Sequence, residues 1–193
     1  MAKELLNGVD VERLAGTVEA IKADPSLAAF TFRARNRWVV GADNRTTVGD
    51  FHGAGEAQTR AKPFLLMNDE PPVLLGRDRA PNPVEFVMHA LAGCLTTSLV
   101  YHAAARGIRI EEVETAFEGD IDLRGFLGLS PGTRNGYRHL AVTMRVKADA
   151  PPETVEELCQ LAQSRSPVFD IVSNPTPISV RVEQANPLAP APA

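Results

Sequence analysis

The alternation of apolar and polar positions predicts strands on both sides of one long apolar helix. From Phe30 to Val40 apolar residues alternate with threonine and arginine, the period-two pattern of a strand with one basic face. Residues 45–51 and 56–67 are predicted as two further strands, because glycine-containing turn sequences separate them. The main part of the chain is therefore expected to begin with three strands.

The segment from residue 82 to residue 106 is predicted to be the long helix. Asn82 suits the N-cap, Pro83 suits the first helical position, and Glu85 stands where a capping box requires a glutamate. Gly107 fits the C-terminal cap. Apolar residues fall on nearly every face of this helix, a pattern typical of a helix buried on all sides.

Strand patterns resume after the helix. They predict strands over residues 113–123 and 140–146, a second helix from Asp149 to about Pro167, and a last strand over residues 178–182. The resulting order, β-β-β-α-β-β-α-β, does not alternate strands and helices regularly, which indicates an α+β fold.

The two ends differ from the rest of the chain. Residues 1–27 are predicted to be an N-terminal helical extension, and residues 28–184 to be one domain, as suits a chain of 193 residues. Residues 185–193 are rich in proline and alanine and are expected to be a disordered tail.

Composition narrows the function classes. Twenty Lys and Arg against 24 Asp and Glu give a net charge of −4, which argues against a nucleic-acid partner. No run of about 18 apolar residues is present and the N-terminus lacks a secretory signal, so we expect a cytoplasmic protein without a membrane partner. Two cysteines are too few for a disulfide framework or an all-cysteine zinc site.

Cys94, in the middle of the long helix, is the first candidate for chemistry. Free cysteine is often simply buried as a small apolar residue. Its neighbour Gly93 costs a helix about 1 kcal/mol relative to alanine, so this glycine needs a reason. Either a substrate or another backbone comes close beside the sulfur, or two helices pack tightly there.

Four segments carry a resemblance to a known family. They are Asn36-Arg-Trp-Val-Val-Gly, Asp69-Glu-Pro-Pro-Val-Leu-Leu-Gly, Pro81-Asn-Pro-Val-Glu-Phe-Val-Met-His-Ala-Leu-Ala-Gly-Cys-Leu and Ser166-Pro-Val. From about Phe30 to Glu183 the chain resembles the OsmC/Ohr family. The resemblance implies an intertwined homodimer, with two sheets wrapped around two long central helices and active sites at the subunit interface. It also implies thiol-dependent reduction of organic hydroperoxides in an oxidative stress response, with Cys94 as the peroxidatic thiol.

The chain departs from the family pattern at the resolving cysteine, where Ser166 stands. Cys159 is seven residues earlier, about 10 Å away along a helix, whereas a disulfide needs Cα atoms about 4.4–6.8 Å apart. We therefore interpret Cys159 as a core residue. A one-cysteine enzyme is expected, without a bound cofactor, whose sulfenic acid is reduced by an external thiol or dithiol.

The resemblance also implies a cation beside the sulfur and a carboxylate that steadies it. Arg45 is the best match for the cation, with Arg35 and Arg60 as alternatives, although each is also explained as a solvated strand charge. The family's glutamate, ten residues before the cysteine, is replaced by Val84, and Glu85 falls on the opposite helix face. Glu70 is the remaining candidate carboxylate.

Two other functions stay open. The fold may bind a small lipophilic ligand at the dimer interface without catalysis, which the Ser166 and Val84 departures favour. An acyl-transfer nucleophile at Cys94 or Ser166 ranks last, because neither His89 nor His102 shares the helix face of Cys94. The histidines show no metal-binding spacing. A basic stripe on the first strand is interpreted as a solvated sheet face or the site of an acidic partner; it consists of Arg33, Arg35 and Arg37.

Overall fold

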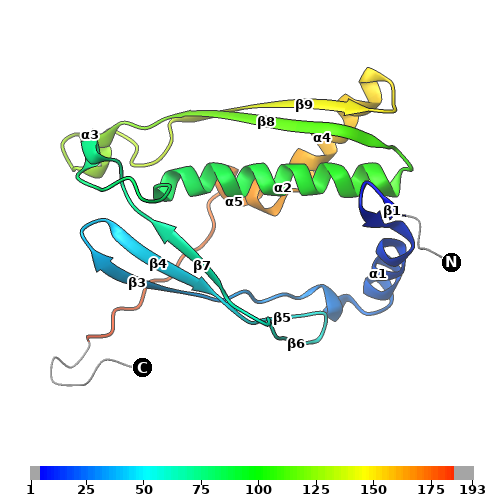
Figure 1. Cartoon of the computed structure of the whole chain (residues 1–193), viewed down its shortest axis with the longest axis horizontal. Helices are drawn as coiled ribbons and strands as arrows, with labels where there is room; N and C mark the ends of the chain where they lie inside the picture. The colour runs from blue at the N-terminus through cyan, green and yellow to red at the C-terminus, as the bar shows by residue number, and fades with distance from the viewer. Residues whose placement is uncertain (1–4, 185–193) are drawn as a thin grey trace.

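The computed structural model describes residues 5–184 and has the expected mixed α+β architecture (Figure 1). The predicted tail over residues 185–193 lies outside the described residues. At the N-terminus, a two-stranded hairpin leads into a helix that ends in a short 3₁₀ turn. These elements are β1 (Leu5–Leu6), β2 (Val9–Asp10), α1 (Val11–Ala23) and η1 (Pro25–Ala28).

The N-terminal sheet has three antiparallel strands in the order β3-β4-β7, and a small hairpin, β5-β6, is inserted in the chain between β4 and β7. The bounds are β3 (Ala34–Val40), β4 (Asp43–Val48), β5 (Phe51–Gly53), β6 (Glu56–Gln58) and β7 (Phe64–Asn68). The second predicted strand is thus interrupted at Gly49 and Asp50. Oδ1 of Asp50 accepts the N–H of Arg60 at 2.9 Å, which fixes the chain where it leaves the sheet.

A short 3₁₀ turn, η2 (Pro72–Leu74), precedes the long helix α2 (Pro83–Ala105). The predicted capping box is confirmed. Oδ1 of Asn82 accepts the N–H of Glu85 at 2.9 Å, and Oε2 of Glu85 accepts the N–H of Asn82 at 2.8 Å. Two of the donors that the first helical turn leaves unpaired are satisfied in this way.

The rest of the fold covers one side of α2. It consists of a long antiparallel hairpin and the helices that follow, with bounds β8 (Ile110–Asp120), α3 (Leu123–Phe126), β9 (His139–Ala148), α4 (Pro152–Arg165) and α5 (Pro167–Ser173). The predicted strand after α2 ends at Asp120, because Asp122 caps α3 by accepting the N–H of Arg124 at 3.0 Å. The second predicted helix is confirmed as α4, and a further helix that was not predicted, α5, begins after Ser166, which ends α4 and caps α5.

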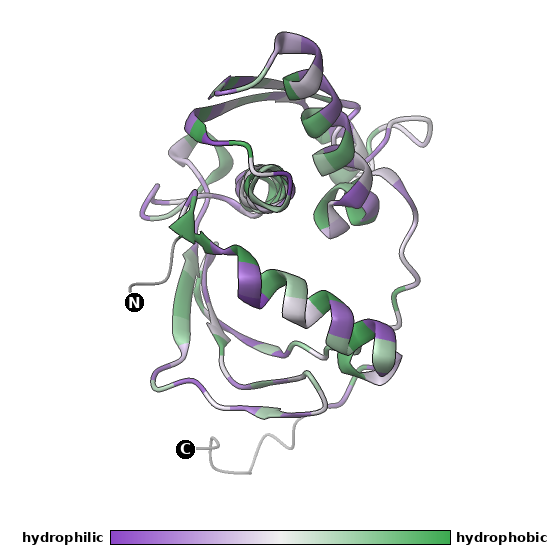
Figure 2. Cartoon of the chain, turned by 90° about the vertical axis from the view of Figure 1, so that its right-hand side faces the viewer, coloured by the Kyte–Doolittle hydropathy of each residue, from purple (hydrophilic) through white to green (hydrophobic). Residues whose placement is uncertain are grey.

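The hydrophobic core lies between α2, α4 and the β8–β9 hairpin. Its buried centre is Leu99, Ala103, Leu158 and Ala162. Partly buried aliphatic side chains of the hairpin, among them Val113 and Met144, pack against this centre. Figure 2, which looks along α2, shows the hairpin and α4 on one side of the helix and α1 on another.

The prediction that α2 is buried on all sides is wrong for this chain. One face is buried, through Leu91, Leu95 and Leu99, but Gly93 and Thr97 are exposed. By length and composition alone α2 could cross a membrane, although no run of 18 apolar residues was expected. That is weak evidence, because the core helix of a soluble protein passes the same criterion.

The predicted last strand is also absent, since residues 174–184 form no helix or strand. Its apolar side chains are exposed, Ile178 at 83%, Val180 at 84% and Val182 at 88%. A strand needs a neighbouring edge for its backbone hydrogen bonds, and no described strand of this chain pairs with the segment.

The N-terminal sheet stands apart from the helices of its own chain (Figure 1). Every residue of β3 is exposed, and large side chains of the sheet face solvent, with Trp38 69% and Phe64 57% exposed. These apolar side chains are not covered by any part of the chain that the structure describes.

Candidate functional site

Cys94 lies on α2, about three turns from its N-terminus, and is half-buried. A helix turns by about 100° per residue, so Cys94 lies beside the buried Leu95 on one side and the exposed Gly93 on the other. The sulfur therefore sits at the border between the face that the chain covers and the face that it leaves open. From that position a small molecule or a second chain can reach it.

A side chain at Gly93 would point into open space in the described part of the chain. A Cβ atom built on it meets no heavy atom within 4 Å outside the helix backbone. Intrachain packing therefore does not explain a residue that costs the helix about 1 kcal/mol. Nothing among residues 5–184 accounts for a glycine at this position.

Ser166 is 2% exposed and lies at the junction of α4 and α5, both of which pack on α2. Its Oγ accepts the N–H of Phe169 at 3.1 Å and so caps α5. This structural role was missed at the sequence level, although a serine followed by proline is a recognisable helix-start signal. The hydroxyl thus has a function here whether or not the position takes part in redox chemistry.

Arg45 is exposed on β4, directly opposite Arg37 of β3. Among residues 5–184 no hydrogen bond joins Arg45 to Cys94, and its sheet stands apart from α2. Of the two alternatives, Arg35 is likewise exposed on β3. Arg60 is already engaged, since its guanidinium lies 5.2 Å from the ring centre of Phe51 and 4.8 Å from that of Phe64.

Glu70 lies two residues after the end of β7 and is half-buried. Its Oε2 is buried and has no hydrogen-bond partner among the described residues. A carboxylate oxygen in that state is available to a donor that the described part of the chain does not supply. Among residues 5–184, no hydrogen bond assembles Cys94, Arg45, Ser166 and Glu70 into one cluster.

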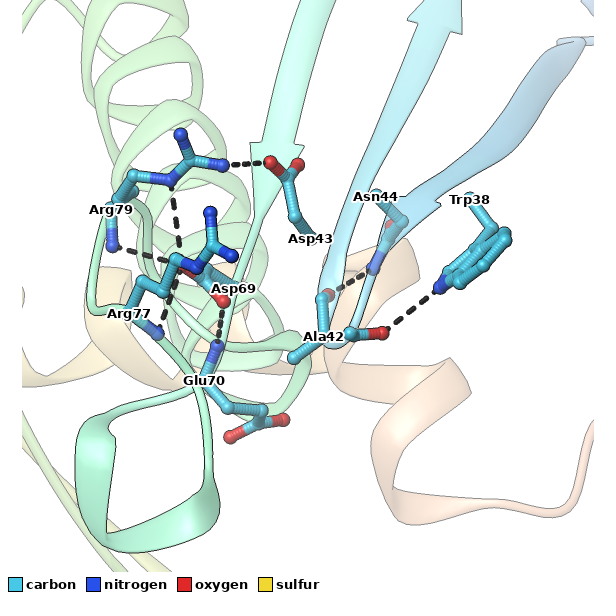
Figure 3. Close-up of polar contacts among 9 residues, drawn as sticks. Trp38, Ala42, Asp43, Asn44, Asp69, Glu70, Arg77 and Arg79 are labelled. Atoms are coloured by element: carbon cyan, nitrogen blue, oxygen red, sulfur yellow. Dashed lines mark hydrogen bonds and ion pairs between the residues drawn. The ribbon is translucent and has the colours of Figure 1, made fainter.

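A polar clamp that the sequence analysis did not foresee fixes the loop around Glu70 (Figure 3). Asp69, 2% exposed, accepts the backbone N–H of Glu70 at 2.9 Å, of Arg77 at 3.3 Å and of Arg79 at 3.2 Å. The guanidinium of Arg79 contacts the carboxylate of Asp43 on β4 and lies 3.9 Å from Asp69. The loop between β7 and α2 is thereby joined to β4.

These bonds have an electrostatic consequence. The N–H of Glu70, more than any other group, holds the pKa of Asp69 below its ordinary value, and Arg77 and Arg79 act in the same direction. Asp69 is therefore a structural anion. Its position before Glu-Pro-Pro was visible in the sequence, but its hydrogen-bond partners were not.

Cys159 packs against the core cluster on α4, which confirms its interpretation as a core residue. Burial raises the pKa of its thiol, and Glu156 adds to the effect. The thiolate of Cys159 is accordingly disfavoured, which leaves Cys94 as the candidate for chemistry.

Among residues 5–184 no group of three or more His, Cys, Asp or Glu side chains is placed to hold a metal ion.

The geometry defines a class: α+β proteins in which a long central helix carries a half-buried thiol beside an uncovered face. The sequence model described as OsmC-like protein matches residues 76–181, more than half of the chain. The chain belongs to this OsmC-like family.

Solved structures agree on the fold. An OsmC-like protein from Mycoplasma pneumoniae is 13% identical with a TM-score of 0.57, over 75% of this chain and 89% of that one. A Legionella pneumophila organic hydroperoxide resistance protein OsmC, described as a predicted redox protein, is 18% identical with a TM-score of 0.51, over 75% of this chain and 90% of that one. A Psychrobacter arcticus osmotic stress and detoxification response protein is 14% identical with a TM-score of 0.52, over 72% of this chain and 85% of that one. The search of curated proteins found no match.

Proposed function

We propose that this protein reduces organic hydroperoxides with an external thiol, and that Cys94 is the peroxidatic residue. The observation that carries the proposal is the half-buried position of Cys94 at the border of the open face of α2. Family membership supports it, since the Legionella relative carries the name of a hydroperoxide resistance protein. The protein is proposed to act in the cytoplasm, in an oxidative stress response.

The reaction needs one cysteine and two equivalents of thiol. The Cys94 thiolate attacks the outer peroxide oxygen and the O–O bond breaks, so that the alcohol leaves after taking up a proton and Cys94 becomes a sulfenic acid. An external thiol then displaces water and forms a mixed disulfide with Cys94. A second thiol, or the other half of a dithiol, releases the Cys94 thiol and leaves oxidised reductant. No bound cofactor takes part.

A homodimer is part of this proposal. The exposed sheet and the unexplained Gly93 support it, because both leave surface that a second copy would cover. We propose that the sites lie at the interface and that Arg45 stabilises the Cys94 thiolate there. The unpartnered Oε2 of Glu70 is proposed to hold that guanidinium.

The test is steady-state turnover of cumene hydroperoxide with dihydrolipoamide or dithiothreitol as the reductant. Cys94→Ser is expected to abolish turnover, whereas Cys159→Ala, the matched removal of the other thiol, should retain it. Absence of turnover in the native protein, or unchanged turnover in Cys94→Ser, refutes the proposal.

A second candidate function is the binding of a small lipophilic ligand at the dimer interface without catalysis. The observation that favours it is the capping bond of Ser166, which accounts for this residue without a resolving step. The pH dependence of Cys94 alkylation separates the two functions. A rate that rises only above about pH 8 favours the binder, and fast alkylation near neutral pH favours the enzyme.

A further inference from the structure

Two buried carboxylates lie side by side at one end of the β4–β7 pair. Asn44 of β4 stands opposite Asn68 of β7. Continued by one residue, this antiparallel register sets Asp43 beside Asp69. Asp43 is 4% and Asp69 is 2% exposed. Like charges in neighbouring positions of a sheet repel each other, and burial strengthens the repulsion, so the pair requires a cation.

Arg79 supplies that cation to both carboxylates (Figure 3). Its guanidinium contacts Asp43, and its Nε lies 3.9 Å from Oδ2 of Asp69. Among the described residues Asp43 forms one ion pair, the one with Arg79, and its Oδ1 is buried without a hydrogen-bond partner. Removing one partner of a buried ion pair leaves an uncompensated charge. The polar clamp therefore depends on Arg79.

The polar clamp joins the two segments of backbone that carry Arg45 and Glu70. Arg45 is two residues after Asp43 on β4, about 7 Å along the strand and on the same face. Glu70 directly follows Asp69 and donates its N–H to that carboxylate at 2.9 Å. A shift of the loop against β4 would therefore change the distance between Arg45 and Glu70.

The backbone of Glu70 is held on both sides. Its N–H is bonded to Asp69, and its carbonyl oxygen accepts the N–H of Asp78 at 3.0 Å. Gly76 packs against the same carbonyl group so closely that no Cβ atom fits between them. The side-chain Oε2, by contrast, is buried without a partner among residues 5–184. The loop thus fixes the backbone of a residue whose carboxylate still has an acceptor free, as a group that holds a guanidinium requires.

We propose that Arg79 is a positioning residue for the thiol site. Through the polar clamp it sets how Arg45 and Glu70 lie relative to each other, and their arrangement decides how strongly Arg45 stabilises the Cys94 thiolate. This inference rests on the proposed function, in which Glu70 holds the guanidinium of Arg45. Arg79 acts through these two groups and not on the peroxide. Because the polar clamp is complete within one chain, the two groups are arranged before a second copy docks.

The experiment measures the rate of Cys94 alkylation by iodoacetamide between about pH 5 and pH 10, in Cys159→Ala so that a single thiol reacts. The midpoint of this parent is expected below the ordinary value of about 8.5. Arg79→Gln should raise the midpoint by about one unit, which lowers the alkylation rate and kcat/KM for cumene hydroperoxide about tenfold at a pH below both midpoints. Near pH 10 parent and variant should react alike, because the thiol is then ionised in both. Arg79→Lys, which keeps a cation, should recover most of the parent's midpoint.

Arg77→Gln is the matched control, since it removes an exposed arginine from the same loop but keeps the backbone N–H that Asp69 accepts. Its alkylation midpoint should equal that of the parent. A merely structural role of Arg79 would lower the urea midpoint of Arg79→Gln and leave its alkylation midpoint unchanged, and that result overturns the proposal. If Arg79→Gln does not fold, the same measurement is made on Asp43→Asn/Arg79→Gln, which removes a buried anion together with its cation. The same rise is expected there, and an unchanged midpoint overturns the proposal.

Turnover separates this inference from the function on which it rests. A parent that does not turn over cumene hydroperoxide refutes the proposed function, and the positioning role of Arg79 falls with it. A parent that turns over the peroxide, with equal kcat/KM and equal alkylation midpoints in Arg79→Gln and Arg77→Gln, refutes the positioning role alone.

Discussion

Asn7 binds the backbone of Ile110, the first residue of β8, across 103 positions of sequence. Its Oδ1 accepts the N–H of Ile110 at 2.8 Å, and its Nδ2 donates to the carbonyl oxygen of Ile108 at 2.9 Å. One side chain thus attaches the N-terminal hairpin to the turn between α2 and β8. The extension is a fastened part of the fold, and α1 lies against α2 in both views (Figures 1 and 2).

Asn7→Ala should lower the free energy of unfolding by about 1–3 kcal/mol, because a half-buried N–H and C=O lose their partners. Asn7 also has a φ of 54°, which asparagine tolerates better than alanine. Urea denaturation followed by circular dichroism measures the change. Asn7→Asp keeps the acceptor for Ile110 but loses the donor to Ile108, so an intermediate loss is expected; equal stability of all three proteins contradicts the assigned role.

Acid is expected to weaken the clamp at Asp69. Hydrogen bonds hold its pKa in the folded state below the ordinary 3.8, so the carboxylate stabilises the fold above about pH 4. That stabilisation is lost as the pH falls through the lowered pKa, because the folded state must then bind a proton that it binds weakly. Urea midpoints at pH 6, 4 and 3 should fall more steeply for the native protein than for Asp69→Asn. Parallel curves would show that Asp69 does not contribute.

Gly76 should tolerate no larger side chain. A Cβ atom there would lie 1.7 Å from the carbonyl oxygen of Glu70, which is backbone and cannot rotate away. Gly76→Ala should therefore cost several kcal/mol or leave the protein unfolded, as measured by thermal denaturation. In Gly16→Ala, on the open surface of α1, a Cβ meets nothing within 4 Å, and the helix should gain about 1 kcal/mol. A mild effect at Gly76 would mean that the turn is differently shaped.

Gly93→Leu tests what covers the open face of α2. A Cβ atom at this position meets no heavy atom within 4 Å outside the helix backbone, so a monomer should fold normally and with a more stable helix. If a second copy packs there, as proposed, the bulk should weaken the dimer by an order of magnitude or more. Sedimentation over a range of concentrations gives the dissociation constant. An unchanged dimer would place the interface elsewhere.

Ser166→Cys tests whether this position faces Cys94. One equivalent of cumene hydroperoxide should then convert the two thiols to a disulfide, seen as the loss of two hydrogens in the intact mass without external reductant. The capping bond to Phe169 weakens in the variant, at a cost of about 1 kcal/mol. Ser164→Cys, on the exposed surface of α4 two residues earlier, is the control that should give no such disulfide.

The sequence by itself determined those features of the structure that depend on residues close together in the chain. The capping box of α2 depends on Asn82 and Glu85, three residues apart, and the core position of Cys159 followed from helical spacing. The alternation that placed Arg35 and Arg37 on one strand face was equally readable. The family resemblance, now shown, came from short motifs of the same kind.

Only the tertiary structure decided which residues far apart in the sequence contact each other. The contact of Arg79 with Asp43 joins residues 36 positions apart, and the bonds of Asn7 span more than a hundred; neither leaves a periodic signal. The same holds for which face of α2 is covered and for the missing last strand, since burial and strand pairing depend on neighbours from distant segments. The alternation of apolar residues at Ile178, Val180 and Val182 indicates a strand. A strand forms, however, only where the unpaired edge of another strand lies within hydrogen-bonding distance.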